Sequence, residues 1–281
     1  MNTLKTHKRH SGTLDIPMTN DYLFKALLQE NNIVLRGLLC SLLHLNDSDI
    51  KSTEITNSII LGEDFTDKTI MLDVNIVMNN NTQINLEMQV IDYGDWPERS
   101  LFYLSRIFSK GERGGLYKDI TPVHQISIVN FTLFDDSPLF YATYKMLEQK
   151  NHNLYSDKLA LSVLDLTKVN NATDEDKAYG IDKWARLFAS KTWEDLHMLA
   201  QENSLFAEAT KTVQQLTDDD TIREACFRRD EQLALEAYFK STIAQQEAAL
   251  KQKDSEIAEK DSTIAEMSAE IAKLKAMLES Q

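Results

Sequence analysis

Two acids and an amide are the residues of this sequence whose types and spacing could do chemistry: Asp73, Glu87 and Gln89. They lie in two neighbouring segments, 69–78 and 83–90, in which polar and apolar residues alternate. Such alternation predicts two β-strands, each with one polar and one apolar face, and it leaves the second strand half buried. The acids and the amide all fall on the polar face.

The chain between these strands, residues 79–81, consists of asparagines, which tolerate the left-handed backbone of a tight turn. With a three-residue turn there, an antiparallel hairpin pairs residues whose numbers sum to 160. This register sets Asp73 opposite Glu87 and Asn75 opposite Asn85. A slip of one residue would move every apolar side chain onto the polar face, so the register is strongly specified.

Two carboxylates in directly paired positions have Cβ atoms about 5 Å apart and repel each other unless a positive charge compensates. Mg²⁺ would compensate, because it takes oxygen ligands and is often bound by one or two carboxylates. Water bound to the metal becomes a nucleophile for phosphodiester hydrolysis, and Gln89 could orient that water or a phosphate oxygen. The same spacing also fits a solvated polar face whose acids are neutralised by Lys or Arg.

A basic helix face follows the acid pair in the sequence. Residues 97–112 have the pattern of a helix that begins at Pro97, with Leu101, Leu104 and Phe108 pointing away from that face. The basic and aromatic residues of the face recur at helical spacing and are Arg99, Tyr103, Arg106, Lys110 and Arg113. Such a face could hold a phosphate backbone, and a solvated amphipathic face is the alternative.

Several short motifs occur in order along the chain: NDYLFKALL at 20–28, LDVNI at 72–76, INLEMQ at 84–89, RSLFYLSRIFSKGERGGLYKDITPVHQISIVNF at 99–131 and LF at 133–134. Together they resemble the Rpn family of recombination-promoting nucleases and transposases, a branch of the PD-(D/E)XK nuclease superfamily. The resemblance covers residues 15–135 and continues less distinctly to residue 230.

The resemblance implies a metal-dependent DNA endonuclease, associated with recombination or mobile elements, in which Asp73 and Glu87 bind the metal. The implied metal is Mg²⁺, with Mn²⁺ or Ca²⁺ as alternatives. Gln89 joins them as a catalytic residue at a position where most of the superfamily has lysine, although the Rpn branch also has glutamine there. Glutamine cannot carry the positive charge that lysine offers the transition state.

The resemblance also marks three accessory residues. Asp21 and Lys25 match the family's N-terminal D-x-x-F-K pattern, and Tyr103 matches a further family position. Asp21 equally suits the first turn of a helix, where an acid is favourable to the helix dipole, and Lys25 equally suits a helix surface. For Tyr103 the alternative is packing in the core.

The expected fold class is α/β, with a PD-(D/E)XK nuclease-like core in which helices flank a mixed sheet, followed by a helical region and a C-terminal coiled coil. A helix is expected over residues 19–43, with Thr19 or Asn20 as its N-cap. The other expected elements are strands at 53–61, 124–131 and 158–166 and helices within 176–240. The expected domains are a flexible N-terminus (1–14), the nuclease-like domain (15–170), a helical part (171–240) and the coiled coil (241–281).

Apolar residues recur every seven positions near the C-terminus, which is the spacing of a coiled-coil seam. The a positions are Ile243, Leu250, Ile257, Ile264, Ile271 and Leu278, and the d positions are Gln246, Lys253, Lys260, Met267 and Leu274. Because the first d positions are polar, stable pairing is expected only towards the end of the seam. The expected assembly is a homodimer, with parallel chains, or another homo-oligomer.

Composition limits the functions that are open. Thirty Lys and Arg against 44 Asp and Glu give a net charge of −14, so any DNA contact must be local. Two cysteines are too few for a disulfide framework, and the six histidines show no metal-ligand spacing. The first twenty residues lack the apolar run of a signal peptide, and a cytoplasmic protein without a membrane partner is expected.

Two other functions stay open beside an active DNA endonuclease. One is a catalytically weak nuclease-like module that binds DNA or a partner and is oligomerised by its coiled coil. The other is a helical adaptor in which the hairpin is only scaffold, and this alternative predicts no metal binding. The presence of Asp73, Glu87 and Gln89 together favours the active enzyme.

Overall fold

The computed structural model describes residues 10–50, 53–56, 59–60, 70–71, 74–78, 81–109 and 116–279. The chain divides into two compact units, residues 1–230 and residues 231–281, and each is described by itself. None of the helices within the described residues is both long enough and apolar enough to cross a membrane.

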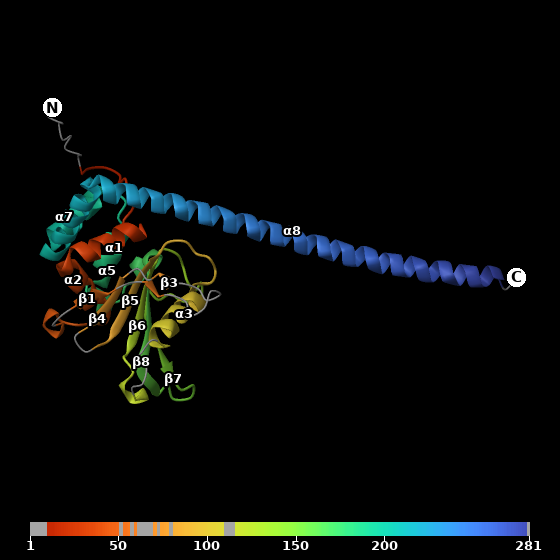
Figure 1. Cartoon of the computed structure of the whole chain (residues 1–281), viewed down its shortest axis with the longest axis horizontal. Helices are drawn as coiled ribbons and strands as arrows, with labels where there is room; N and C mark the ends of the chain where they lie inside the picture. The colour runs from red at the N-terminus through yellow and green to blue at the C-terminus, as the bar shows by residue number, and fades with distance from the viewer. Residues whose placement is uncertain are drawn as a thin grey trace, which may run out of the picture. The chain divides into compact units, whose positions relative to one another are not determined.

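The first unit is built on a mixed sheet whose described strands lie in the order β1-β4-β5-β6-β8-β7 (Figure 1). Their bounds are β1 Thr53–Thr56, β4 Val74–Met78, β5 Gln83–Gln89, β6 Val123–Val129, β7 Tyr141–Leu147 and β8 Leu154–Asp165. Strand β6 pairs in parallel with both β5 and β8, and the outer pairs are antiparallel. Two short strands, β2 (Ile59–Ile60) and β3 (Ile70–Met71), pair with each other separately.

The hairpin of β4 and β5 has the register that the alternation predicts. Val74 pairs with Leu86 and Asn75 with Asn85, so paired numbers sum to 160 as expected. Asn81 in the turn has a φ of 65°, the left-handed conformation for which asparagine is suited. Asp73 lies outside the described residues, and its expected pairing with Glu87 stays a prediction.

Helices cover both faces of the sheet, with α3 on one side and α1, α2 and α5 on the other (Figure 1). The helix bounds are α1 Asp21–Glu30, α2 Asn32–Leu43, α3 Trp96–Ser109, α4 Asp174–Ala178, α5 Ile181–Ala189, α6 Trp193–Glu202, α7 Ser204–Asp218 and α8 Asp220–Glu279. Short 3₁₀ turns occur at Asp47–Asp49, Tyr117–Asp119 and Leu166–Asn171. The main hydrophobic core lies between the sheet and the helices α1, α2 and α5–α7.

The single helix expected over residues 19–43 is wrong, because the chain forms two helices that meet at Asn31. The backbone of Asn31 is extended (φ −126°, ψ 97°), and its side-chain oxygen accepts hydrogen bonds from the N–H groups of Ile33 and Val34. Asparagine favours this capping role over the helix interior, which explains the break. The expected N-cap is confirmed at Asn20, whose side chain accepts from Leu23 N–H.

The expectation of a half-buried strand at residues 83–90 is also wrong, because β5 is buried on both faces. Its polar residues Asn85, Glu87 and Gln89 are 0%, 5% and 9% exposed. The cause is α3, which packs over β6 and β8 and covers this face of the sheet. Polar side chains that the alternation assigned to solvent therefore lie beneath a helix.

Strand β7 has no counterpart among the expected elements, whereas the buried strand at 124–131 and the strand at 158–166 are confirmed as β6 and β8. β7 lies at the edge of the sheet, and most of its side chains are exposed. An edge strand of this kind lacks the clean alternation of a half-buried strand, which is the signal that sequence reasoning uses.

The second unit consists of the continuation of α8 from residue 231. Along it, the apolar residues at heptad spacing from Ile243 to Leu278 are more than half exposed in the single chain. Exposed apolar residues along one helix fit a seam that pairs with another helix. The coiled coil itself stays a prediction.

Candidate active site

The candidate active site lies on the α3 side of the sheet, centred on Glu87 of β5. Glu87 is aligned with Ser127 of the parallel strand β6, and Asn85 is aligned with Gln125 in the same way. Since aligned residues of neighbouring strands share a face and lie about 4.8 Å apart, these four side chains form one compact group. All four are buried.

Helix α3 brings a positive charge to this group. Arg99 Nη2 lies 3.8 Å from Glu87 Oε1, and it donates a hydrogen bond of 3.3 Å to the hydroxyl of Tyr103. The guanidinium carbon lies 5.0 Å from the ring centroid of Trp96, 5.9 Å from that of Tyr93 and 5.7 Å from that of Tyr103. Arg99 is therefore held by three aromatic rings while it faces the acid.

The electrostatics of Arg99 follow from this packing. Burial by itself would lower the pKa of Arg99, but the hydrogen bond to Tyr103 and the negative charges of Glu87 and Asp95 raise that pKa above its ordinary value. The guanidinium accordingly stays charged next to the acid at every pH at which the protein would work.

The polar groups around Glu87 have hydrogen-bonding capacity left over. Asn85 Nδ2 donates to Gln125 Oε1 at 2.7 Å. Among the described residues, Asn85 Oδ1, Gln125 Nε2 and Ser127 Oγ are buried and make no hydrogen bond. Leaving such groups unsatisfied costs free energy, so their presence here favours a site that binds something polar.

Sequence reasoning did not find Gln125 and Ser127. The signal was present, because these two residues alternate with Ile126 and Ile128 along a strand that was expected only to be buried. The pattern places a polar face next to that of β5, as a parallel neighbour in register would.

Gln89, at the end of β5, is also buried, and its Nε2 donates to the backbone oxygen of Ile91 at 2.8 Å. This bond fixes the amide at the edge of the polar face, two residues beyond Glu87. The structure thus brings Glu87, Gln89, Arg99 and Tyr103 to the same side of the sheet.

The remaining residues of the expected basic face are placed only in part. Arg106 lies half-buried on α3, and Lys110 and Arg113 lie outside the described residues. Leu101, expected to point away from the basic face, lies on α3 with a side chain that is 55% exposed. The inward face of α3 instead comprises Trp96, Ser100, Leu104 and Ile107.

The accessory candidates Asp21 and Lys25 lie on α1, and Asp21 is engaged elsewhere. Its carboxylate accepts two hydrogen bonds from Arg229 Nε, at 2.9 and 2.7 Å, and forms an ion pair with the same guanidinium. This contact joins the first turn of α1 to α8 within the first unit. The ion pair with Arg229 gives Asp21 a structural role, and this contact does not involve the candidate active site.

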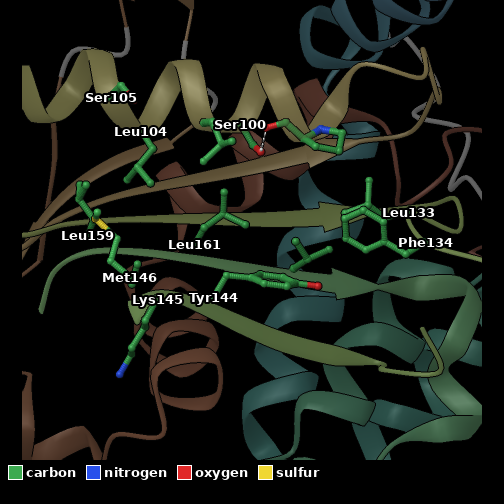
Figure 2. Close-up of a pocket in the computed structure, with 14 residues that line it drawn as sticks. Ser100, Leu104, Ser105, Leu133, Phe134, Tyr144, Lys145, Met146, Leu159 and Leu161 are labelled. Carbon is green, nitrogen blue, oxygen red and sulfur yellow. Dashed lines mark hydrogen bonds between the residues drawn. The ribbon is translucent and has the colours of Figure 1, made fainter. Parts of the chain in front are cut away.

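An apolar pocket of about 430 Å³ lies between α3 and the strands β7 and β8 (Figure 2). Ser100 and Leu104 point into it from the helix, Leu161 forms its floor, and the amine of Lys145 points away from it. The Ser100 hydroxyl is occupied by a hydrogen bond to the Pro97 oxygen at 3.0 Å. A pocket so poor in polar groups does not suit a phosphodiester, so we place the chemistry at Glu87.

A divalent cation fits the donors at Glu87. The buried carboxylate of Glu87 shares its sheet face with Asn85 and Ser127, whose buried side-chain oxygens make no hydrogen bond among the described residues, and Mg²⁺ prefers oxygen ligands. The described part of the chain contains no cluster of three or more His, Cys, Asp or Glu that would hold a metal. Asp73, which the sequence predicts as the second acid of the site, lies outside the described residues.

A mixed sheet covered by helices, with an acid and an amide on a buried polar strand face, defines an α/β domain with a polar site on one face of its sheet. The sequence matches the family of PD-(D/E)XK nuclease family transposases over residues 18–242, and the chain belongs to this family. The match confirms the nuclease superfamily that the motifs indicate. No curated protein and no solved structure matches the chain.

Proposed function

We propose that this protein is a metal-dependent DNA endonuclease that hydrolyses phosphodiester bonds in recombination or in the movement of mobile elements. The observation that carries the proposal is the buried Glu87, which faces Arg99 on a polar sheet face of a chain that belongs to a nuclease family. A carboxylate is costly to bury unless it is paired with a positive charge or coordinates a metal.

Asp73 and Glu87 are the proposed metal-binding acids. Asp73 directly precedes Val74, and Val74 pairs with Leu86, the residue before Glu87. The hairpin register and the family motif thus support the same pair of acids. Mg²⁺ held there would stabilise charge on the phosphate and activate a bound water molecule, and Mn²⁺ or Ca²⁺ could occupy the same ligands.

The other residues of the site are proposed to orient the reacting groups and to offer them hydrogen bonds. Gln89 is proposed to orient the attacking water or a phosphate oxygen through its amide. Ser127, Asn85 and Gln125 form a polar floor that offers hydrogen bonds to groups near Glu87. Tyr103 keeps Arg99 in place beside the acid.

DNA is the proposed substrate, bound through the basic residues of α3 and the chain that follows it. Arg106 belongs to α3, and Lys110 and Arg113 follow at helical spacing in the sequence. The net charge of −14 makes such a local cluster necessary, because the whole molecule repels a polyanion.

Pairing of two chains through the end of α8 is proposed to bring two nuclease domains together. The exposed apolar residues from Ile257 to Leu278 supply about three usable heptads, close to the minimum for a stable coiled coil. Two domains would allow a nuclease with one site per chain to cut both strands.

A weakly active DNA- or partner-binding module is the second candidate. It is favoured by Gln89, which brings no positive charge to the reacting phosphate. The two candidates share the metal site and differ in turnover.

Cleavage of supercoiled plasmid by the full-length protein in Mg²⁺, with and without EDTA, tests the proposal. Wild type is expected to nick or linearise the plasmid only with Mg²⁺, and Asp73→Asn and Glu87→Gln are expected to be inactive. Asp157→Asn, at an exposed position of β8, is the matched control and is expected to cleave normally. Metal binding without cleavage would favour the second candidate, and equal activity in all variants would refute the proposed site.

A further inference from the structure

Arg99 and a bound cation would interact with the same carboxylate. The guanidinium lies 3.8 Å from Glu87 Oε1, and Glu87 is one of the acids proposed to hold the metal. A positive charge at this distance stabilises the ionised carboxylate of Glu87 when the metal is absent, and it repels a metal cation that approaches the same carboxylate. The two cations are therefore expected to compete for Glu87.

The environment of Arg99 allows it to remain charged after it gives up the acid. Three aromatic rings lie within 6 Å of the guanidinium carbon of Arg99. The hydroxyl of Tyr103 accepts a hydrogen bond from the same guanidinium. Cation–π contacts of this kind stabilise a guanidinium without an anion. Its partly exposed side chain, at 29%, also leaves it open to a negatively charged substrate.

We propose that Arg99 is the built-in counter-ion of Glu87: it neutralises the acid in the metal-free protein and yields Glu87 to the metal. The guanidinium then remains beside the site as a positive charge for the phosphate, which Gln89 cannot supply. The inference rests on the proposed metal site, and it assigns to Arg99 a role distinct from the general DNA binding that its spacing suggested.

This role predicts that removal of Arg99 raises the affinity of the protein for a metal ion. Mn²⁺ affinity of the full-length protein would be measured by isothermal titration calorimetry for wild type, Arg99→Gln and Glu87→Gln. Arg99→Gln is expected to bind Mn²⁺ about tenfold more tightly than wild type, because the competing charge is gone, while its kcat for DNA falls. The matched control is Arg186→Gln, at a 61% exposed side chain of α5, which is expected to leave both quantities unchanged.

Tyr103→Phe provides a second test if Arg99→Gln does not fold. It keeps the ring but removes the hydroxyl that holds Arg99, and it is expected to tighten Mn²⁺ binding about twofold. Unchanged or weaker Mn²⁺ binding in both variants would overturn the inference. If wild type and Glu87→Gln bind Mn²⁺ equally, or wild type does not bind it, the proposed metal site fails as well, which is a distinguishable result.

Discussion

The two faces of the central sheet differ in what they contribute. On the side of α1 and α5, β5 and β6 present Leu86, Ile126 and their apolar neighbours to a large core. On the side of α3, the same strands present Glu87, Ser127 and the amides around them. Apolar burial stabilises a fold, whereas buried polar groups cost free energy unless they are paired. The difference indicates that stability comes chiefly from one face, and it supports the proposal that the chemistry takes place on the other.

Adjacent residues of β5 offer the largest contrast between the faces. Leu86→Ala is expected to lower the free energy of unfolding by about 3 kcal/mol, because it leaves a cavity in the main core. Glu87→Gln is expected to lower the melting temperature less than Leu86→Ala does, because it keeps the size of the side chain and Arg99 is partly exposed to water, but to reduce cleavage on the order of a thousandfold. Thermal melts without metal and plasmid cleavage measure the two effects. A melting temperature of Glu87→Gln as low as that of Leu86→Ala would make Glu87 a structural residue.

His124, on the apolar face, is expected to make the free energy of unfolding depend on pH. Burial, with a smaller contribution from the positive charge of Lys145, lowers the pKa of His124 from 6.5 to about 4. The unfolded chain therefore binds more protons between these values, and the free energy of unfolding falls as pH decreases through this window. The loss reaches at most about 3 kcal/mol near pH 4 and is absent above pH 6.5.

Urea unfolding of wild type and His124→Gln at pH 7 and pH 4.5 measures this effect. Glutamine does not titrate, so the variant should lose less stability on acidification than wild type does. Equal losses of stability in both proteins would show that groups other than His124 cause the loss at acidic pH. His124 Nε2 is 2.8 Å from Ser162 Oγ, a contact that the glutamine amide can replace.

Ser127→Ala is expected to have a smaller effect, and only on the polar face. The hydroxyl makes no hydrogen bond among the described residues, so its loss should change the free energy of unfolding by less than about 1 kcal/mol. Cleavage should fall several-fold, because the polar floor beside Glu87 is reduced. Denaturant melts and initial cleavage rates measure both quantities, and a clear loss of stability without loss of cleavage would contradict this assignment.

Removal of the chain after residue 240 is expected to have no effect on the stability of the first unit. The contacts of Arg229 with Asp21 and of Asp230 with Asn20 lie before that cut. Light scattering over a concentration series should show dimers only for the full-length protein. Equal masses for the two proteins would show that the heptad repeat does not pair.

Much of the fold is predictable from the sequence because it depends on local patterns. The β4–β5 register follows from alternation on both strands, since a slip of one residue would exchange the faces. The break at Asn31 was missed because the apolar residues on either side of it form one continuous helical pattern. Only the capping geometry of the asparagine separates the two helices.

The candidate site is less predictable because burial depends on tertiary packing. Alternation assigns Glu87 to a polar face, and it cannot show that α3 covers that face. The spacing that groups Arg99 with Arg106 likewise cannot show that Arg99 is turned towards an acid on another element. Gln125 and Ser127 become part of the site only through the parallel pairing of β6 with β5, which is a contact between distant parts of the chain.

Anomalous diffraction from crystals soaked in Mn²⁺ tests the central claim most directly. The account predicts a manganese peak bound to the Glu87 carboxylate, on the α3 side of β5, with a metal–oxygen distance of about 2.1 Å. The same peak should be absent from crystals of Glu87→Gln. A peak elsewhere, or equal peaks in wild type and Glu87→Gln, would contradict the assignment of Glu87 as a metal ligand.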